Sequence, residues 1–352
     1  MEKRMTIGMD LGDKKHVICV LDAAGSVVKR EAITNSKAAL GKFFKEYAGS
    51  LVVVETGTHS AWISRELESL GCEVLVGNAR KLRAIWTSKN KSDVHDAEML
   101  ARLGRADRAL LHPVHHRGPE AQQDLAVLKA RDMLVATRTD LVNHVRGAVK
   151  GMGFRIAKCS TDAFAQRAKE SMPKELLPAL LQLLKQIEAM TVAIRKYDKQ
   201  IARQVEKRHG DAEQLRQVPG VGPVTSLAFV LTLEESGRFK KSRSVGAYLG
   251  LTTRRDQSGE TDKQLRITKA GDGFLRRLLV GCSHYILGVH GPDCELRRFG
   301  LKLAARGGKN AKRRAIVAVA RKLGVLLHRL WVTGEKYDPE YMKSRMTREE
   351  AA

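Results

Sequence analysis

The sequence predicts an α/β domain at the N-terminal end and a long, mainly helical, basic remainder, so the fold class is α/β plus α. Two observations lead to this prediction. Residues 5–78 alternate Val- and Ile-rich runs with amphipathic stretches, and apolar residues recur every seven positions between about 120 and 207. At roughly 150 residues per domain, the 352 residues suggest two or three domains. An apolar fraction of 43% excludes a wholly disordered chain.

The charge of the chain is strongly positive. Lys and Arg number 63 against 39 Asp and Glu, which gives a net charge of +24. This excess predicts a polyanionic partner, with nucleic acid first and a membrane surface second. No uncharged stretch approaches the roughly 20 apolar residues of a spanning helix, so no membrane partner is expected. Aromatic residues make up only 5% of the chain, which favours contacts with phosphates over base stacking.

Cysteine usage points to a reducing compartment. The five cysteines are an odd number, are widely scattered and form no C-x-x-C, which excludes a disulfide framework and a thiolate zinc site. The first residues run directly into a strand-like segment, so no signal peptide is expected. Together these features predict a cytoplasmic protein.

The N-terminal domain is expected to cover residues 1–110. Its first part reads as three strands, MTIGMDLG, HVICVLD and SVVKREAIT, within residues 5–34. The elements expected next are a helix at 36–47, a strand at 51–57, a helix at 60–70, a strand at 72–78 and helical segments across 79–106. Three strands followed by alternating helix and strand is the order of the ribonuclease H-like fold, and it also suits other mixed sheets.

The central segment, residues 120–207, carries two runs of heptad spacing separated by a break at 151–173. The first run is Leu128, Val135, Val142 and Val149, and the second is Leu180, Ile187, Ile194 and Ile201. This pattern predicts either a helical hairpin or a dimerising coiled coil, and an ordinary helical bundle is the alternative. Thr191 and Asp198 interrupt the second seam.

Residues 210–335 are expected to form a mostly helical, basic C-terminal domain. Its last long helix is predicted over residues 310–332, with cationic side chains off its apolar stripe. The remaining residues, 336–352, are polar and are expected to fray.

Four carboxylates form the candidate catalytic group. Asp10 lies inside the first strand and Glu55 ends the run LVVVE, where a carboxylate is costly unless a positive charge meets it. In a ribonuclease H-like sheet the first and fourth strands are neighbours, so these two side chains would converge. In KSDVHDAEMLARL, Ser92 can cap a helix, and Asp93 and Asp96 then share one face of its first turn.

Carboxylates gathered in this way repel one another unless divalent cations neutralise them. Two Mg²⁺ ions about 3.5–4 Å apart, with Mn²⁺ as a substitute, would do so and would clamp both oxygens of an in-line phosphoryl transfer. Each residue also has an ordinary interpretation. Asp10 and Glu55 could be strand-end acids, and Asp93 could simply favour the helix dipole. The ordered set of four is more specific than its members.

The segments MTIGMDLGDKKHVICVLD, VVVETGTHS and NKSDVHDAEMLARL resemble the DEDD transposases of bacterial insertion sequences, whose N-terminal domain is like that of the RuvC Holliday-junction resolvases. Asp10, Glu55, Asp93 and Asp96 match the family pattern, and the resemblance covers residues 5–106 and 214–335. It implies catalytic and metal-binding roles for these four residues in the bacterial cytoplasm, at the nucleoid.

The C-terminal half continues this resemblance. QVPGVGPVTSLAFVLTL has the P-G-h-G turn of a helix–hairpin–helix motif, in which Gly220 and Gly222 would let backbone N–H groups hold a DNA phosphate. A plain helix–helix turn is the alternative. Residues 239–279 resemble the C-terminal transposase domain of the family, the bridge-RNA-guided recombinases. By this resemblance Ser258, in Gln257-Ser258-Gly259, is the nucleophile that forms a phosphoserine bond to DNA.

The resemblance also implies partners. These are donor and target DNA, a structured guide (bridge) RNA, and further copies of the chain in a dimer or tetramer, so that the carboxylates and the serine meet across subunits. Basic residues near Ser258 could hold phosphates, with a solvated basic face as the alternative. They are Arg254, Arg255, Arg266, Lys269, Arg276 and Arg277.

Two other functions compete with a transposase that cuts and rejoins DNA. A hydrolytic nuclease of the Holliday-junction-resolvase type would use the four carboxylates and water, without Ser258. A non-catalytic nucleic-acid-binding protein would need none of them. The complete set of four acids argues against the latter, because clustered carboxylates cost energy that a binding protein has no reason to bear.

Overall fold

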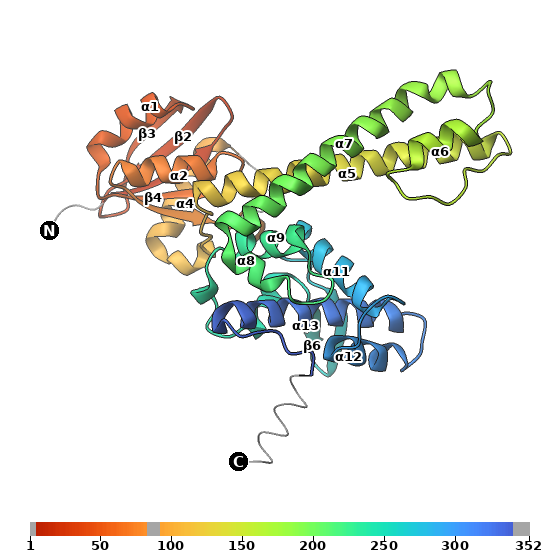
Figure 1. The fold of residues 1–352 in the computed structure, drawn as a ribbon. Helices are drawn as coiled ribbons and strands as arrows, with labels where there is room; N and C mark the ends of the chain where they lie inside the picture. Colours follow the sequence, from red (N-terminus) through yellow and green to blue (C-terminus); the bar gives the residue numbers. More distant parts are fainter. Residues whose placement is uncertain (1–4, 83–91, 341–352) are drawn as a thin grey trace, which may run out of the picture. The chain divides into compact units, whose positions relative to one another are not determined.

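The computed structural model describes residues 5–82 and 92–340 (Figure 1). The chain forms two compact units that divide after Arg117, and each is described by itself. Part of the helical prediction over residues 79–106, the first residues of the motif NKSDVHDAEMLARL and most of the predicted tail lie outside the described residues.

The first unit is a five-stranded mixed sheet with helices on both faces. Its strands are β1 (Thr6–Leu11), β2 (Lys15–Leu21), β3 (Val27–Thr34), β4 (Leu51–Glu55) and β5 (Glu73–Gly77), in the order β3-β2-β1-β4-β5. Its helices are α1 (Lys37–Phe44), η1 (Lys45–Tyr47), α2 (Ser60–Ser69), α3 (Ala79–Leu82), α4 (Asp93–Ala106) and η2 (Arg108–Leu111). The described elements follow the predicted ones closely, and the arrangement is compatible with a ribonuclease H-like domain. The first and fourth strands are parallel neighbours, as expected.

Strand alternation divides the sheet between two layers of helix. Ile7, Met9 and Val54 point to one face and share a core with α1 and α2. Val53 points to the other face and packs with Leu100 of α4. The four consecutive apolar residues of β4 are buried on both faces, which explains its unbroken hydrophobic run.

Helix α4 lies very close to the sheet because β1 carries a glycine where the two meet. A Cβ atom on Gly8 would overlap the backbone of Ala97 and Ala101. Near its C-terminal end α4 touches the turn between β2 and β3, where Arg102 donates a 3.5 Å hydrogen bond to the carbonyl oxygen of Gly25. That turn adjoins the start of β1, so α4 runs antiparallel to β1 and its first turn points to the end of β1.

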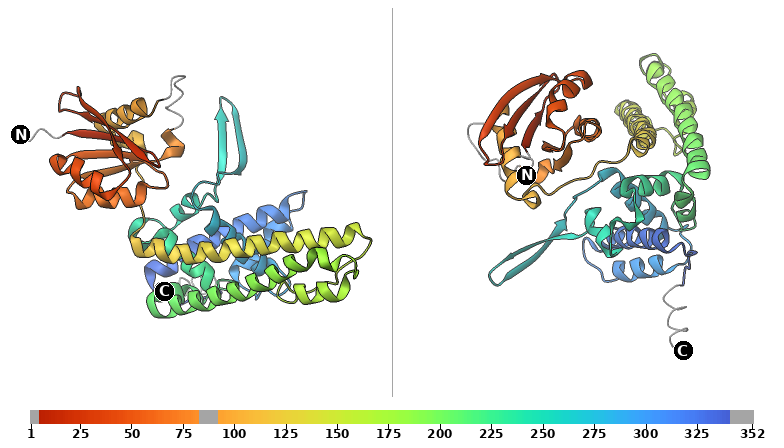
Figure 2. Two further views of the ribbon diagram at one scale, coloured as in Figure 1. Left: turned by 90° about the horizontal axis from the view of Figure 1, so that it is seen from above. Right: turned by 90° about the vertical axis from the view of Figure 1, so that its left-hand side faces the viewer.

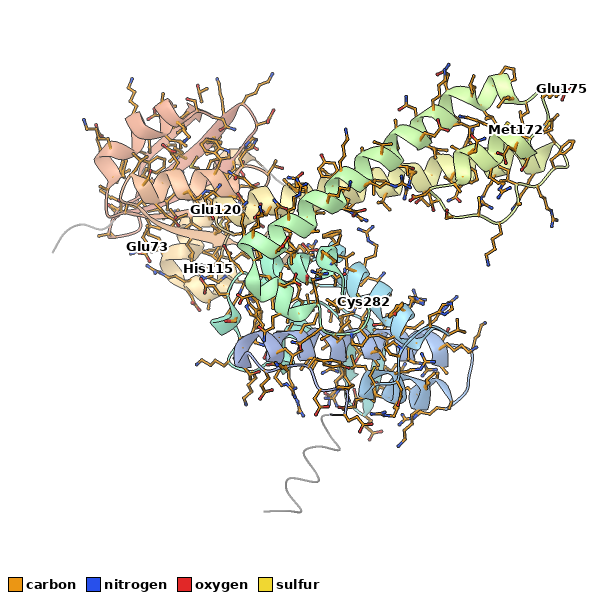
Figure 3. All side chains as sticks on the ribbon, in the orientation of Figure 1. Glu73, His115, Glu120, Met172, Glu175 and Cys282 are labelled. Atoms are coloured by element: carbon orange, nitrogen blue, oxygen red, sulfur yellow. The ribbon has the colours of Figure 1, made fainter. Side chains whose placement is uncertain are left out.

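The second unit begins with two long helices that lie side by side and antiparallel (Figures 1 and 3). They are α5 (Pro119–Gly151) and α7 (Leu177–Arg208), and the short α6 (Phe164–Ser171) packs against them near their junction. In Figure 3, the labels of Met172 and Glu175 mark the end of the two long helices at which they are joined. The structure therefore pairs the two heptad runs within one chain, as a helical hairpin; dimerisation through them remains a prediction.

The two residues that interrupt the second seam make polar contacts between these helices. Arg131 Nε donates a 2.5 Å hydrogen bond to Asp198, and Arg138 donates a 3.0 Å hydrogen bond to the hydroxyl of Thr191. Thr191 is buried and also donates to the carbonyl oxygen of Ile187. Paired polar groups at seam positions favour one register of two helices. The contacts of Thr191 and Asp198 therefore define how α7 aligns with α5.

Among the described helices, α7 is the one long and apolar enough to cross a membrane by length and composition alone. A helix packed within a protein passes the same test. Its contacts are those of a packed helix, since Asp198 pairs with Arg131 and Arg195 pairs with Asp162. The absence of a membrane partner stays a prediction.

The remaining helices form a body around one hydrophobic core. They are α8 (Gly210–Leu215), α9 (Pro223–Leu233), η3 (Ser236–Arg238), α10 (Arg243–Tyr248), α11 (Gly273–Leu287), α12 (Glu295–Ala304) and α13 (Ala311–Thr333). Cys282, labelled in Figure 3, lies in this core on α11. Helix α9 is buried from Thr225 to its end, which explains why its sequence is apolar on every side. Leu125 of α5 and Val205 of α7 join the same core and attach the hairpin to the body.

Two expectations for the C-terminal region were wrong in part. Residues 253–267 lie within the stretch expected to be mostly helical, but they form a two-stranded antiparallel sheet of β6 (Thr253–Ser258) and β7 (Thr261–Ile267), which projects from the body (Figure 2). Its polar, solvent-exposed residues lack the apolar alternation of a buried strand, so the pattern hid it. Residues 336–340 are anchored rather than frayed, because Glu295 N donates to the carbonyl oxygen of Pro339 and Tyr337 packs against the core.

His328, on α13, is a fully buried neutral histidine of the second unit. Its Nδ1 accepts from the Ser242 hydroxyl at 2.9 Å, and its Nε2 donates to the carbonyl oxygen of Ser236 at 3.0 Å. Burial lowers the pKa of His328 below its ordinary value of 6.5. Protonation would put a second donor opposite the Ser242 hydroxyl and a charge into the core.

We expect Gly8→Ala to destabilise the protein by about 1–3 kcal/mol or more, because the new methyl group meets the backbone of α4 rather than a side chain that can move. Gly41→Ala in α1 is the matched control. Nothing lies within 4 Å of that position, so alanine should stabilise helix α1 by about 0.5–1 kcal/mol. Urea unfolding measures the free energy of unfolding of both variants. Equal changes in this free energy for Gly8→Ala and Gly41→Ala would contradict the close packing at Gly8.

We expect the buried His328 to make stability depend on pH. The unfolded histidine has the higher pKa, so below about pH 6.5 the unfolded state binds more protons and the free energy of unfolding falls as pH falls. His328→Gln should be less stable than wild type at pH 7.5 but should lose less stability between pH 7.5 and 5.5. Parallel pH dependences in the two proteins would show that His328 is not a source of this loss.

Candidate active site

The structure places Asp10 and Glu55 side by side at one edge of the sheet. The recorded pairs of the parallel β1–β4 ladder end at Met9 and Val54, and the next residues along the two strands are Asp10 and Glu55. By alternation Asp10 shares the face of Gly8, and Glu55 shares the face of Val53. Both carboxylates are therefore on the α4 side of the sheet, where each is half-buried.

Asp93 and Asp96 come to the same edge from α4. The Ser92 hydroxyl accepts a 3.2 Å hydrogen bond from His95 N, so it caps the helix as predicted. Asp93 lies one turn before Ala97, on the stripe that faces β1, and Asp96 lies one turn before Leu100, on the stripe that packs against β4. Since α4 runs antiparallel to β1, this turn lies toward the strand ends that carry the other two acids.

The four carboxylates thus share one face and one end of the first unit, but they do not form a closed cage. Asp93 is exposed and Asp96 is half-buried. Among residues 5–82 and 92–340, no three His, Cys, Asp or Glu side chains come together closely enough to hold a metal ion. The donor set consists of carboxylate oxygens, which are the ligands of a hard cation such as Mg²⁺. The set fits that group by its chemistry and its common edge.

The loops that follow Asp10 and Glu55 are joined by a contact that spacing alone could not reveal. His59 Nε2 lies 3.2 Å from Asp13 Oδ1, and His59 Nδ1 accepts a 3.3 Å hydrogen bond from Trp62 Nε1. Because Nδ1 is the acceptor, Nε2 carries the proton that it donates to Asp13. Asn35 holds the other side of the first loop, since its Nδ2 donates to the carbonyl oxygens of Gly12 and Asp13 at 3.3 and 3.0 Å. These contacts connect the two loops beside the edge that carries Asp10 and Glu55.

Ser258 lies in the second unit, at the last residue of β6, and is exposed near the tip of the β6–β7 hairpin. Gly259 follows with φ of +53° and starts the turn to β7. The hydroxyl of Thr261, directly across from Ser258, donates a 2.6 Å hydrogen bond to the carbonyl oxygen of Ser258. The backbone at Ser258 is thereby fixed while its side chain faces solvent.

The six basic residues near Ser258 fall into two groups. Three are engaged within the unit: Arg255 with Asp262 at 2.6 Å, Arg277 with Asp132 at 2.6 Å, and Arg276 with the carbonyl oxygens of Leu249 and Ala270 at 2.9 and 2.7 Å. The Arg276 contacts join α11 to the base of the hairpin and favour a structural role there. Arg254, Arg266 and Lys269 are exposed and make no ion pair with any residue that the structure describes.

The two glycines of the predicted phosphate-binding turn lie between α8 and α9. Gly220 has φ of +80° and lies against the Tyr285 ring and the Cys282 carbonyl of α11, so a side chain there would be strained and crowded. Gly222 is the N-cap of α9, with nothing within 4 Å of the position that a Cβ would take. Binding of a DNA phosphate at this helix end stays a prediction.

Both parts of the chain match known protein families. Residues 7–154 match the DEDD_Tnp_IS110 family, described as transposase. Residues 212–294 match the Transposase IS116/IS110/IS902 family. The first match contains all four carboxylates, and the second contains Ser258 and the two glycines of the turn.

Curated bacterial proteins are similar along most of the chain. The transposase for insertion sequence element IS1111A of Coxiella burnetii is 27% identical over 94% of this chain and 90% of its own length. A probable family 20 transposase of Pseudomonas aeruginosa is 28% identical over 78% and 81%. The transposase for insertion sequence element IS1328 of Yersinia enterocolitica is 26% identical over 79% and 82%.

We expect His59→Ala to weaken Mn²⁺ binding at the proposed carboxylate site by about 2- to 5-fold, because it removes one exposed contact, worth roughly 0.2–1 kcal/mol, between the loops that follow Asp10 and Glu55. Asp13→Asn breaks the same contact from the other loop and should act in the same direction. Mn²⁺ titration followed by electron paramagnetic resonance measures the affinity, with thermal unfolding as the check on folding.

A variant that carries both His59→Ala and Asp13→Asn tests whether the two residues act through their contact or independently of each other. If His59 and Asp13 act only through each other, His59→Ala with Asp13→Asn should bind Mn²⁺ about as weakly as His59→Ala alone. Additive losses, or Mn²⁺ affinity equal to wild type in both single variants, would contradict the role assigned to this contact.

Proposed function

Because the chain belongs to the IS110/IS116/IS902 family of transposases, we propose that it cuts and rejoins the DNA of an insertion sequence through a covalent phosphoserine bond to Ser258. The observation that supports this proposal is that Asp10, Glu55, Asp93 and Asp96 lie on one face and at one edge of the first unit, carried there by β1, β4 and α4. Family membership indicates use of a divalent metal, and the carboxylate oxygens at that edge are suitable ligands for Mg²⁺.

The proposed role of the four carboxylates is to hold cations against DNA. When bound, two Mg²⁺ ions would offset the repulsion among the acids and polarise the scissile phosphate. Asp10 and Glu55 supply ligands from the sheet, and Asp93 and Asp96 supply them from the helix end. Because the two pairs belong to different elements, binding would bring the first turn of α4 and the strand ends closer together.

The proposed covalent step conserves the phosphodiester bond energy. The Ser258 Oγ attacks the phosphorus and loses its proton, the bond from phosphorus to one DNA end breaks, and that end leaves as a hydroxyl after taking up a proton. The hydroxyl of a second DNA end then attacks the phosphoserine and restores Ser258. No high-energy cofactor is needed, which distinguishes strand exchange from hydrolysis.

The charge distribution supports further parts of the proposal. The net charge of +24 suits a protein that holds donor DNA, target DNA and a structured guide RNA by their backbones, with base pairing choosing the sequence. A dimer or tetramer would present two DNA duplexes together and would let one subunit's serine meet another's carboxylates. We place this activity in the bacterial cytoplasm, on the nucleoid.

Ser258→Ala should abolish a denaturant-stable protein–DNA adduct that wild type forms on suicide DNA substrates, with Mg²⁺ and RNA from the flank of the element. Ser244→Ala is the matched control, because Ser244 is an exposed serine of the same unit and should leave the adduct unchanged. Asp10→Asn should also abolish it, since the scissile phosphate would no longer be polarised. Adducts are counted by denaturing gel electrophoresis.

The opposite outcome identifies the competing function. Nicking at equal rates in wild type and Ser258→Ala, with no adduct in either, would reject the serine nucleophile and favour a hydrolytic nuclease of the resolvase type. Activity of Asp10→Asn equal to wild type would reject both enzymes.

A further inference from the structure

The register of the β6–β7 hairpin assigns its side chains to two faces. Residues directly opposite in an antiparallel pair point to the same side, and successive residues alternate. Ser258 pairs with Thr261 and Asp256 pairs with Lys263, so these four share one face. The other face carries the remaining recorded pairs of this stretch, Gln257 with Asp262 and Arg255 with Gln264.

The face opposite the serine is held by its own ion pair. Arg255 Nε and Nη2 each donate a 2.6 Å hydrogen bond to a different oxygen of Asp262. The hydrogen bond from Arg255 lowers the pKa of Asp262, which is therefore a carboxylate at neutral pH. This bidentate contact joins the two strands and occupies the guanidinium of Arg255. Arg255 is thus poorly placed to reach a phosphate attacked by Ser258.

Lys263 is the cation on the serine's face. It is exposed, and in the part of the chain that the structure describes it makes no ion pair. It lies diagonally from Ser258 across the pair, at roughly 7–8 Å between such positions, a span that the four-carbon stem of lysine can bridge. A phosphate in contact with the Ser258 hydroxyl is therefore within reach of the Lys263 ammonium.

The carboxylate of Asp256 weakens the attraction of the Lys263 ammonium for distant anions. It lies directly across from Lys263, at about 5 Å between Cβ atoms, and nearly cancels its charge at a distance. Lys263 consequently adds little to the general attraction of DNA. Its effect is confined to a group that comes close to the serine.

We propose that Lys263 is a catalytic residue that binds the scissile phosphate on the serine's face of the hairpin. This rests on the proposed function of Ser258. The ammonium donates hydrogen bonds to a non-bridging phosphate oxygen and stabilises the charge that grows there as the Ser258 oxygen attacks.

A face swap tests this proposal with the net charge held constant. Lys263→Gln removes the cation, and the double variant Lys263→Gln with Gln257→Lys returns it next to Ser258 in sequence but on the opposite face. Position 257 lies across from Asp262, so a lysine there does not oppose another cation. Lys263→Arg keeps a cation on the serine's face. The readout is the rate of adduct formation with saturating suicide DNA, together with DNA affinity.

Lys263→Gln and the double variant should both form the adduct at least about 10-fold more slowly than wild type, while Lys263→Arg stays within about threefold. The double variant should bind DNA about as tightly as wild type. Rates equal to wild type in the double variant would overturn the proposal, because a cation on either face would then suffice. Absence of an adduct in wild type would instead reject the serine nucleophile itself.

Discussion

The close approach of α4 to β1 at Gly8 is the constraint on which the first unit depends. With no side chain at this position, the helix backbone lies directly on the strand, and its direction is set by contacts with the β2–β3 turn. An antiparallel helix in this place necessarily starts at the edge where β1 and β4 end. The carboxylates of strand and helix therefore lie at the same edge because of backbone packing at Gly8, at a distance from the acids themselves. The packing that positions α4 is thus located away from the carboxylates, where their mutual repulsion does not act on it.

The second unit relies on polar groups to define one arrangement of two long apolar helices. Asp124 of α5 is buried and accepts from Gln204, Arg208 and His209 at the end of α7. Further along, Arg131 contacts Asp198 and Arg138 contacts Thr191. Such polar pairs, of which Asp124 and Thr191 are buried and Asp198 is partly exposed, favour one register of the two helices, because a helix displaced by one turn would leave them without partners. The hairpin thereby keeps a fixed length and attachment to the body.

Sequence reasoning anticipated the first unit well because its elements are periodic and its strands are apolar. The succession of elements along the chain, the cap at Ser92 and the adjacency of the first and fourth strands, with Asp10 and Glu55 at their ends, all follow from local pattern and fold class. It failed for β6 and β7, where exposed, charged strands carry no apolar alternation. The contacts of His59 with Asp13 and of Arg276 with Leu249 also escaped it, since each joins residues far apart in sequence. Their partners are set by tertiary packing alone.

The β6–β7 hairpin bears on the role proposed for Ser258. Six residues of strand extend about 20 Å, so the serine lies far from the core that anchors the base of the hairpin. Its neighbours on β6 and in the turn are exposed, and water screens every charge around it. A serine hydroxyl in such surroundings is a weak nucleophile at neutral pH. Under the proposed function, the isolated chain would therefore hold Ser258 in an unactivated state until DNA or another surface excludes water from the tip of the hairpin.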